Sequence, residues 1–202
     1  LRLMEQNTRH VNHAVIVGGG LIGIEMAEML LSRGIHVTFL VREESYWNTV
    51  LPPEESAMIN RHIREHGIDL RLSTELKEIL SDESGRARGV RTGSGDEIDC
   101  QFVGLTAGVH PNIAVCEGSG IETGRGVLVN EFFETGIPDV YAIGDCAEFA
   151  ATDGGRNRVE QLWYTARMHG EALAANLCGE RKPYDRGILF NSAKFFDIEY
   201  QT

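Results

Sequence analysis

Three glycines in the segment Val17–Glu25, which reads VGGGLIGIE, have the spacing of a dinucleotide-binding turn. Gly18 would make the tight turn after a strand, Gly20 would let the backbone approach a pyrophosphate, and Gly23 would let a helix pack closely on the strand. The positive N-terminal end of that helix would face the phosphates. Glycine-rich turns also occur for packing alone, so the spacing needs a strand before it and a helix and a strand after it. The predicted binding residues of this turn are Gly18, Gly19, Gly20, Leu21, Ile22 and Gly23.

The position that would recognise the adenosine ribose holds Val41, followed by Arg42. In the NAD form of such a site, a carboxylate about 20 residues after the glycines accepts hydrogen bonds from the ribose hydroxyls. Valine cannot do this, whereas Arg42 can meet the 2′-phosphate of NADPH with a charge-assisted contact. In the alternative, Arg42 is a solvated loop residue and Glu43 or Glu44 serves the ribose of NAD. Because carboxylates beside a phosphate are unfavourable, the sequence favours NADP only somewhat over NAD.

A second candidate site lies at Gly144 and Asp145, which follow the apolar run Val140–Ile143. This run predicts a buried parallel strand, with Gly144 letting the backbone approach a ligand at the carboxyl end of the strand. Asp145 would present an acceptor suited to the hydroxyl groups of a polyol. The alternative is an aspartate that caps a helix or stabilises a turn, which is common for isolated Gly-Asp pairs.

Histidine and cysteine offer weaker candidates for chemistry. His62 and His66 stand four residues apart on a predicted helix, a spacing that could hold a metal. No third ligand is evident from the sequence, so we expect a solvated helix face and no metal site. The four cysteines are far apart and form no CxxC pair. Cys146 follows Asp145 without a partnered histidine, so we expect it to be a small packing residue.

The composition is that of an ordinary globular protein, with 202 residues of which 42% are hydrophobic and 24% charged. A formal net charge of -11, from 19 Lys and Arg against 30 Asp and Glu, argues against partners such as nucleic acid or an anionic membrane. No run approaches the roughly 18 apolar residues of a membrane span. Because the cysteines fit a reducing compartment, we expect a cytoplasmic protein.

The elements around the glycine turn predict a strand, a helix and a second strand, which together make a parallel βαβ unit. Short segments separated by SDESG and GSGD predict an antiparallel meander after it. A glycine-rich loop at Asp153–Gly155 precedes a long helix. The expected strands are 13–17, 35–41, 68–72, 76–80, 87–92, 97–101, 102–106 and 127–129, and the expected helices are 21–31, 52–66 and 160–177.

The sequence resembles the FAD-dependent pyridine nucleotide-disulfide oxidoreductase superfamily. Within it the likeness is to the NAD(P)H-dependent ferredoxin, rubredoxin and nitrite reductase-like flavoproteins. The resemblance covers nearly the whole chain and rests on VIVGGGLIGIEMAEML, on AGVHPN from Ala107 to Asn112, and on TGIPDVYAIGDCA from Thr135 to Ala147. The last motif is far more specific than the glycine spacing, because a Thr, a Pro-Asp, a hydrophobic strand and a Gly-Asp occur together.

This resemblance implies roles for single residues. Asp145, with Gly144, would bind the ribityl chain of FAD, and the helix starting near Glu160 would direct its N-terminus at the flavin ring, where it favours negative charge on the reduced flavin. Glu25 would lie near the nicotinamide and the flavin as the catalytic residue. The alternative is an exposed carboxylate in the first helical turn, which the helix dipole favours anyway. The further implied binding residues are Ala107, Gly108, Glu160, Gln161 and Leu162.

The expected fold class is α/β, with a Rossmann-like nucleotide-binding domain that holds a parallel sheet and an antiparallel β-meander, plus a partial FAD-binding domain. The implied domains are 1–107, which binds NAD(P); 108–182, the C-terminal part of an FAD-binding domain; and 183–202, the opening of a C-terminal interface domain. Family members begin with another glycine fingerprint for the FAD pyrophosphate. We therefore expect a fragment that lacks the N-terminal FAD half and is inactive without it.

The resemblance implies part of a flavin-dependent NAD(P)H oxidoreductase with FAD and NADP, or alternatively NAD, as cofactors. Hydride would pass from NAD(P)H to FAD and on to a small electron-carrier protein or a small-molecule acceptor. The full-length protein could form a homodimer through its C-terminal domain. The alternative from another functional class is a non-catalytic nucleotide-binding or redox-sensing module.

Overall fold

The structure is a computed structural model, and it describes residues 9–151, 156–188 and 191–201. The predicted loop at Asp153–Gly155 lies outside the described residues. The backbone divides into two compact units, each described below by itself. The first takes the described residues through Gly108 together with Ser192–Tyr200, and the second takes those from Val109 to Asn191.

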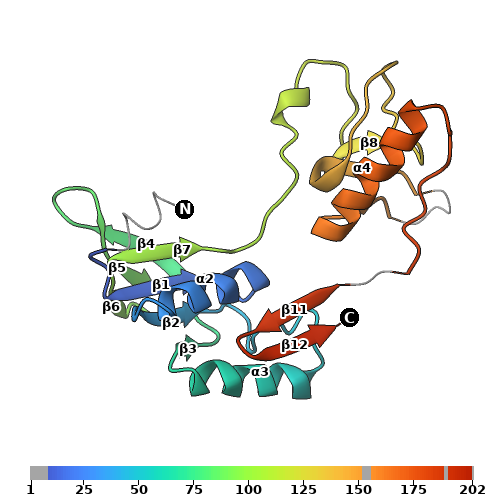
Figure 1. Ribbon diagram of the computed structural model, residues 1–202. Helices are drawn as coiled ribbons and strands as arrows, with labels where there is room; N and C mark the ends of the chain where they lie inside the picture. Colours follow the sequence, from blue (N-terminus) through green and yellow to red (C-terminus); the bar gives the residue numbers. More distant parts are fainter. Residues whose placement is uncertain (1–8, 152–155, 189–190, 202) are drawn as a thin grey trace. The chain divides into compact units, whose positions relative to one another are not determined.

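The first unit is built on a parallel sheet in the order β3-β2-β1-β7 (Figure 1). Its strands are β1 (His13–Val17), β2 (His36–Leu40), β3 (Asp69–Arg71) and β7 (Phe102–Leu105). The apolar runs of β1 and β2 form central strands because both of their faces can be buried, as a parallel sheet requires. On β1, Ala14 and Ile16 enter one core cluster while Val15 enters another.

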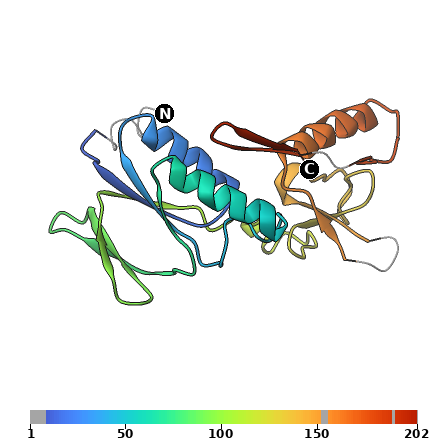
Figure 2. The same cartoon turned by 90° about the horizontal axis from the view of Figure 1, so that it is seen from below.

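Two helices cover one face of this sheet, α2 (Leu21–Leu31) and α3 (Pro53–Glu65) (Figure 2). In α3 a proline occupies the first turn together with Glu54 and Glu55, and both features suit a helix N-terminus. The apolar side of α2 packs Ile24, Ala27 and Leu30 into the same cluster as Phe39 of β2. The helices therefore hold the sheet from one side.

An antiparallel meander covers the other face of the sheet. It consists of β4 (Leu76–Ser81), β5 (Ala87–Thr92) and β6 (Glu97–Asp99), in the order β4-β5-β6. Val90 and Ile98 of the meander form a core cluster with Val15 and Leu40 of the parallel sheet. The predicted α/β fold, with a parallel sheet and a meander, is confirmed.

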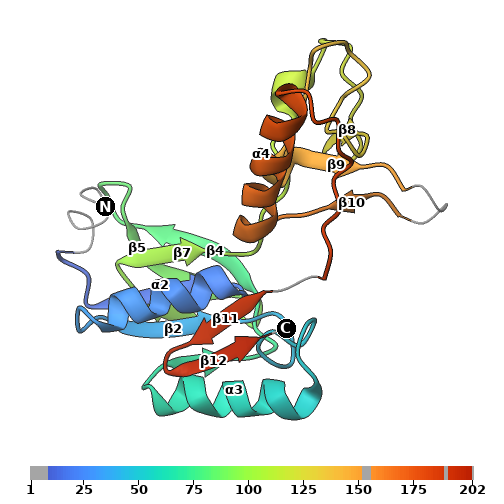
Figure 3. The same cartoon turned by 45° about the vertical axis from the view of Figure 1, so that its right-hand side comes forward.

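The hairpin of β11 (Ser192–Phe195) and β12 (Ile198–Gln201) also packs in the first unit (Figure 3). Phe195 is fully buried in the core that α2 and α3 share, with its ring 6.3 Å from that of Tyr46 and 5.3 Å from that of Trp47. The sequence analysis assigned residues 183–202 to the opening of a third domain, and that assignment stays a proposal. Within the described residues, this segment contributes apolar side chains to the core of the first unit.

The second unit contains a small sheet in the order β10-β9-β8 and the helix α4 (Trp163–Leu177). Its strands are β8 (Val127–Val129), β9 (Ala147–Phe149) and β10 (Arg158–Val159), and its short 3-10 turns are η1 (Ala114–Cys116) and η2 (Gly144–Cys146). Strands β8 and β9 are parallel, while β9 and β10 are antiparallel. Phe133, Phe149, His169 and Tyr184 pack their rings together at the centre of this unit.

Two predicted elements of the second unit are wrong. Val140–Ile143 is not a buried parallel strand: a tight turn, with Asp139 at a φ of 61°, folds this run back on residues 133–135, and Tyr141 pairs with Glu134 in an isolated antiparallel bridge. The strand beside β8 is β9, which follows the Gly-Asp pair. The helix predicted from Glu160 begins at Trp163. Arg158–Val159 forms β10, which pairs with β9, and residues 160–162 connect β10 to the helix.

Candidate functional site

The glycine turn between β1 and α2 has the geometry that its spacing predicts. Gly18 has a φ of 121°, and a Cβ placed on it would lie 2.6 Å from the carbonyl oxygen of Thr106. A Cβ on Gly23 would lie 3.1 Å from the ring of Phe39, because α2 crosses closely over β2 at this point. Gly18 therefore requires glycine for reasons that lie inside the protein, while a side chain at Gly23 would force its close neighbours to shift by a few tenths of an ångström.

Gly20 is different because its glycine is not required by any neighbouring protein atom. A Cβ placed on Gly20 would have no atom within 4 Å among the described residues, and the backbone of Gly20 is extended, with φ -111° and ψ 175°. The same residue is the N-cap of α2, which no side chain caps with a hydrogen bond. The first N–H groups of the helix are thus left for another acceptor, as they are in sites that bind pyrophosphate. The open space at Gly20 and the uncapped N-terminus of α2 therefore both fit the phosphate of a dinucleotide.

Tyr46 holds the glycine turn from behind. Its hydroxyl donates a hydrogen bond of 2.7 Å to the carbonyl of Gly20, and its backbone N–H donates one of 2.9 Å to the side chain of Asn60 on α3. The backbone carbonyl of Tyr46 accepts a further bond, from the Ser56 hydroxyl at 2.7 Å. Burial raises the pKa of Tyr46, so its hydroxyl stays protonated and can donate. Nothing in the sequence analysis identified Tyr46, because a lone aromatic residue after β2 has no recognisable spacing.

The loop after β2 presents Arg42 and buries Val41. Val41 is fully buried, and its Cγ1 lies 3.0 Å from where a Cβ on Gly19 would be, so it supports the turn and cannot bind a ribose hydroxyl. The side chain of Arg42 is 73% exposed and forms an ion pair of 2.9 Å with Glu43. An anion bound by Arg42 must therefore share the guanidinium with this carboxylate or displace it.

The residues after the carboxyl end of β7 lie next to the end of β1, where the glycine turn begins. Thr106 follows β7, and its hydroxyl donates a hydrogen bond of 3.0 Å to the carbonyl of Val17 at the end of β1. Ala107 and Gly108 come next and are exposed, with Gly108 at a φ of 103°. In the order β3-β2-β1-β7, the chain runs from β1 to β2 and β3 on one side of β1 and, after the meander, returns to β7 on its other side. Ligands of open α/β sheets bind at this kind of switch point.

Glu25 lies further along α2 than expected. It is the fifth residue of the helix, so the alternative of an acidic residue in the first turn is wrong. Its side chain is exposed, as is that of Ile22 one turn earlier, and residues three apart share a helix face. In the part of the chain that the structure describes, no other side chain forms a hydrogen bond or ion pair with Glu25.

In the second unit, Gly144 and Asp145 form the turn η2 directly before β9. Gly144 has a φ of 70°, in the left-handed region that favours glycine. Its backbone N–H donates a hydrogen bond of 3.0 Å to Nδ1 of His169, a fully buried side chain on α4. A backbone N–H can only donate, so Nδ1 of His169 is the acceptor and its Nε2 carries the proton.

The carboxylate of Glu160 accepts a hydrogen bond from the protonated Nε2 of His169. Nε2 of His169 lies 3.1 Å from the Glu160 carboxylate, the hydroxyl of Tyr184 donates to the same oxygen at 2.9 Å, and Arg158 forms an ion pair with the other oxygen at 2.5 Å. Burial alone would raise the pKa of Glu160, but the hydrogen bonds from His169 and Tyr184 and the charge of Arg158 lower it overall. The carboxylate therefore stays ionised and orients His169 towards the Gly-Asp turn.

Each unit, taken by itself, brings together residues that the sequence singled out. The first unit gathers the glycine turn, Val41, Arg42, Ala107 and Gly108 at the carboxyl ends of its parallel strands. The second unit connects Gly144 to Glu160 through His169, while Gln161 and Leu162 directly precede α4. The sequence analysis did not identify Thr106, His169 or Tyr184. All four cysteines are free, and Cys146 is partly exposed.

Comparisons with known proteins agree with this geometry. A profile of the family described as pyridine nucleotide-disulphide oxidoreductase matches residues 1–170. The chain is 37% identical over 189 residues to the 5,5′-dehydrodivanillate O-demethylase ferredoxin reductase subunit of Sphingobium sp., covering 93% of the chain and 45% of that protein. It is 30% identical over 193 residues to the nitrite reductase (NAD(P)H) of Bacillus subtilis, covering 95% of the chain and 23% of that protein.

A solved structure is also similar. The ferredoxin reductase for the CYP199A2 system from Rhodopseudomonas palustris superposes with a TM-score of 0.89 at 28% identity, and the match covers 99% of the chain and 49% of that structure. The chain therefore spans less than half the length of the relatives it matches. Among the residues that the structure describes, none of the helices combines the length and apolar composition needed to cross a membrane.

Proposed function

The chain belongs to the pyridine nucleotide-disulphide oxidoreductase family, and from this premise we propose that it is part of a flavin-dependent NAD(P)H oxidoreductase. The observation that carries the proposal is the turn at Gly20, where the protein leaves open space and an uncapped helix N-terminus side by side. In this proposal residues 1–107 bind NAD(P)H, residues 108–182 contribute the C-terminal part of an FAD-binding domain, and residues 183–202 lead into a C-terminal domain.

The chemistry in this proposal is hydride transfer from the nicotinamide to a bound flavin, which the two cofactors supply. The chain's own residues bind and orient them. Amides of the glycine turn and the α2 N-terminus meet the pyrophosphate, while Glu25 extends from the exposed face of the same helix. Asp145 offers its carboxylate to the ribityl hydroxyls. Glu160 acts through His169 to hold the turn that carries Asp145.

The proposed role of Asp145 predicts a specific loss of flavin. In the full-length protein, Asp145→Ala is expected to raise the FAD dissociation constant about tenfold, since a hydrogen bond to a charged group contributes about 1.5 kcal/mol. Fluorescence titration of the apoprotein with FAD measures this change. Cys146→Ala is the matched control because Cys146 lies in the same 3-10 turn, and it should leave both FAD affinity and NAD(P)H oxidation unchanged. Equal FAD affinity in the Asp145→Ala and wild-type proteins would remove Asp145 from the flavin site.

Arg42 supports a preference for NADPH over NADH. Arg42→Glu is expected to weaken NADPH binding about tenfold and to leave NADH binding unchanged or tighter, because an exposed charge-assisted contact to the 2′-phosphate is lost. Isothermal titration of the chain with each nucleotide measures the two affinities. Arg61→Glu is the matched control, since the side chain of Arg61 on α3 is 71% exposed, close to the 73% of Arg42.

A substitution of Glu43 distinguishes a loop that binds the 2′-phosphate of NADPH through Arg42 from one that binds the ribose of NAD through Glu43. If Arg42 binds the 2′-phosphate, Glu43→Gln frees the guanidinium from its ion pair and tightens NADPH binding. If Glu43 instead serves the ribose of NAD, the same substitution weakens NADH binding and leaves NADPH binding unchanged. Tighter binding of NADH than of NADPH, together with no effect of Arg42→Glu, would contradict the NADPH preference.

We also propose that the acceptor is a small electron-carrier protein or a small molecule. The relatives support this class, since one is the ferredoxin reductase subunit of a demethylase and another is a nitrite reductase. A net charge of -11 speaks against nucleic acid as a partner. The full-length protein is proposed to associate as a homodimer through its C-terminal domain. A non-catalytic nucleotide-binding module would bind NAD(P)H without oxidising it, so reduction of a bound flavin by NAD(P)H separates the enzyme from such a module.

A further inference from the structure

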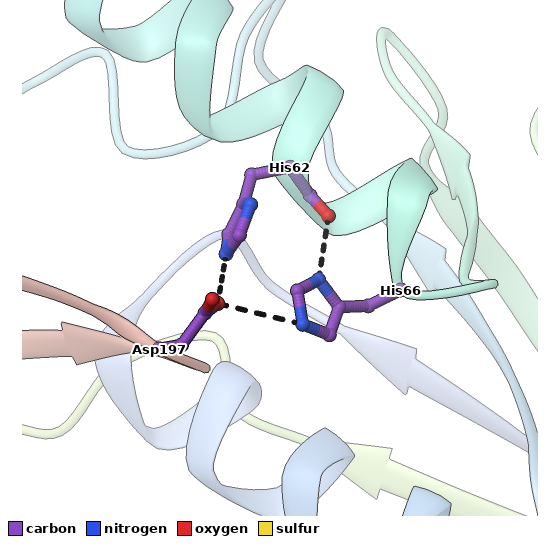
Figure 4. Close-up of side chains that lie close together, drawn as sticks. All are labelled: His62, His66 and Asp197. Carbon is purple, nitrogen blue, oxygen red and sulfur yellow. Dashed lines mark hydrogen bonds and ion pairs between the residues drawn. The ribbon is translucent and has the colours of Figure 1, made fainter.

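Three side chains of the types that bind metals, two histidines and an aspartate, meet in the first unit, away from the glycine turn in sequence. His62 lies in the last turn of α3, His66 is the C-cap residue that follows this helix, and Asp197 lies at the tip of the hairpin between β11 and β12 (Figure 4). One ligand atom from each of them falls within 4.8 Å of the other two. The sequence analysis found no third ligand for the two histidines because Asp197 stands 131 residues after His66. The fold brings this third group to them.

The ring of His66 presents Nε2 to the carboxylate of Asp197. Nδ1 of His66 lies 3.0 Å from the backbone carbonyl of His62, and a carbonyl can only accept, so this Nδ1 carries a proton. Nε2 lies 3.5 Å from the Asp197 carboxylate. In the neutral ring Nε2 has a free lone pair, and a cation between it and the carboxylate would bond to both.

His62 approaches the same carboxylate oxygen of Asp197 as His66 does. Its Nε2 lies 2.7 Å from the same Asp197 oxygen, while its Nδ1 lies 3.9 Å from the carboxylate of Glu65. Both histidines therefore direct Nε2 at Asp197. Histidines that bind metals typically donate their second ring N–H to a carboxylate or a backbone carbonyl, which fixes the orientation of the ring, and His66 makes such a bond to the carbonyl of His62.

We propose that His62, His66 and Asp197 bind a divalent transition-metal ion such as Zn²⁺ through two imidazole nitrogens and one carboxylate oxygen. Metal–ligand bonds of about 2.1 Å place tetrahedral ligands about 3.4 Å apart, which the 3.5 Å between His66 and Asp197 already matches. The 2.7 Å between His62 and Asp197 must lengthen by about 0.7 Å, and this requires only a small movement of an Asp197 side chain that is 77% exposed. The fourth position is open to water.

The packing of the hairpin tip keeps the three ligands together without the metal. Phe196 stacks on the ring of His66 with centroids 4.1 Å apart, although its φ of 59° is unfavourable for a bulky side chain. A metal would add a bond between α3 and the hairpin to this contact. The site would therefore stabilise the first unit, and it is independent of the proposed nucleotide and flavin sites.

Cobalt provides the test, because tetrahedral Co²⁺ bound by nitrogen and oxygen absorbs visible light. Titration of the metal-free chain with Co²⁺ is expected to give visible absorption that saturates at one ion per chain and disappears when Zn²⁺ is added. His66→Gln and Asp197→Asn should each weaken Co²⁺ binding by more than about 100-fold, beyond the loss caused by removing an outer-shell partner. His36→Gln is the matched control, since it removes an exposed histidine from the same unit.

Thermal unfolding gives a second measurement that does not depend on colour. Zn²⁺ at about 100 times its dissociation constant should raise the unfolding midpoint of the wild-type chain by about 5–10 °C and leave that of Asp197→Asn unchanged. Circular dichroism shows whether the variants are folded. Absence of Co²⁺ absorption in the wild-type chain, or equal metal binding by the wild type and both ligand variants, would overturn the proposal. In either case His62, His66 and Asp197 would only connect the hairpin to α3 by a hydrogen bond and ion pairs.

Discussion

Gly20→Ala is expected to weaken NAD(P)H binding about 100-fold while lowering the free energy of unfolding by only about 1 kcal/mol. The stability cost is small because the new Cβ meets no protein atom within 4 Å among the described residues and the backbone is already extended. What remains is the modest preference of a helix N-cap for glycine over alanine. The binding cost is large because the methyl group would occupy the space through which a pyrophosphate reaches the first amides of α2. Losing two charge-assisted hydrogen bonds of about 1.5 kcal/mol each corresponds to about 100-fold.

Gly18→Ala is the matched comparison, and it should show the opposite order of effects. Its Cβ would lie 2.6 Å from the backbone oxygen of Thr106, and its φ of 121° is a conformation that alanine rarely adopts. We expect this variant to lose about 3 kcal/mol of stability before any effect on binding is measured. Urea unfolding followed by Trp47 fluorescence, in a background with the exposed Trp163 changed to Phe, reports on the first unit alone. A Gly20→Ala chain that binds NAD(P)H as tightly as wild type would show that the open space is not the phosphate site.

His169→Leu is expected to destabilise the second unit by about 3 kcal/mol. The substitution removes the acceptor of the Gly144 N–H and the donor to the buried Glu160 carboxylate, and each unsatisfied group costs about 1–3 kcal/mol. The expected local effect is faster hydrogen exchange of the Gly144 amide, measured by NMR. Because Gly144 precedes Asp145, FAD affinity in the full-length protein should fall as well.

His169→Gln tests whether these losses arise from the hydrogen bonds or from packing. The glutamine amide offers one acceptor and two donors, so it should restore part of the protection of the Gly144 amide that leucine removes. If glutamine and leucine lose the same protection, or if the Gly144 amide exchanges at the wild-type rate in His169→Leu, the hydrogen bond does not hold the turn.

Glu160 makes the second unit sensitive to acid. Its pKa in the folded protein lies below its ordinary value, so its contribution to stability is complete above the unfolded pKa of about 4.3 and is lost as the pH falls through the folded pKa. Glu160→Gln should therefore lower stability near neutral pH and flatten its decline below about pH 4.3. This outcome would support a charged carboxylate as the partner of His169.

The first unit could be predicted from the sequence because local and tertiary preferences agree there. The apolar run His13–Val17 is observed as β1 with the predicted bounds. The helix predicted at 21–31 and the strand predicted at 87–92 also begin and end at the predicted residues. Buried parallel strands, an uninterrupted apolar helix face and glycine turns each leave a pattern in a few neighbouring residues. The glycine turn was therefore recognisable before its geometry was known.

The second unit was harder to predict because its order depends on contacts between distant residues. The run Val140–Ile143 is apolar enough for a buried strand, yet the turn at Asp139 folds it back into a short antiparallel contact at Glu134. His169 meets Gly144 across 25 residues, and Asp197 meets His62 across 135. No spacing within either element indicates these partners, so His169 and Asp197 became visible only in the folded chain.

The central claim is that the glycine turn of this chain delivers a nicotinamide nucleotide to a flavin. The most direct test is an anaerobic titration of the full-length protein with NADPH and with NADH, followed by the absorbance of the flavin. We expect a yellow protein whose oxidised-flavin absorption disappears after about one equivalent of nucleotide, and a Gly20→Ala variant that needs a far higher concentration. A full-length protein without flavin, or a flavin that stays oxidised in an excess of both nucleotides, would contradict the account.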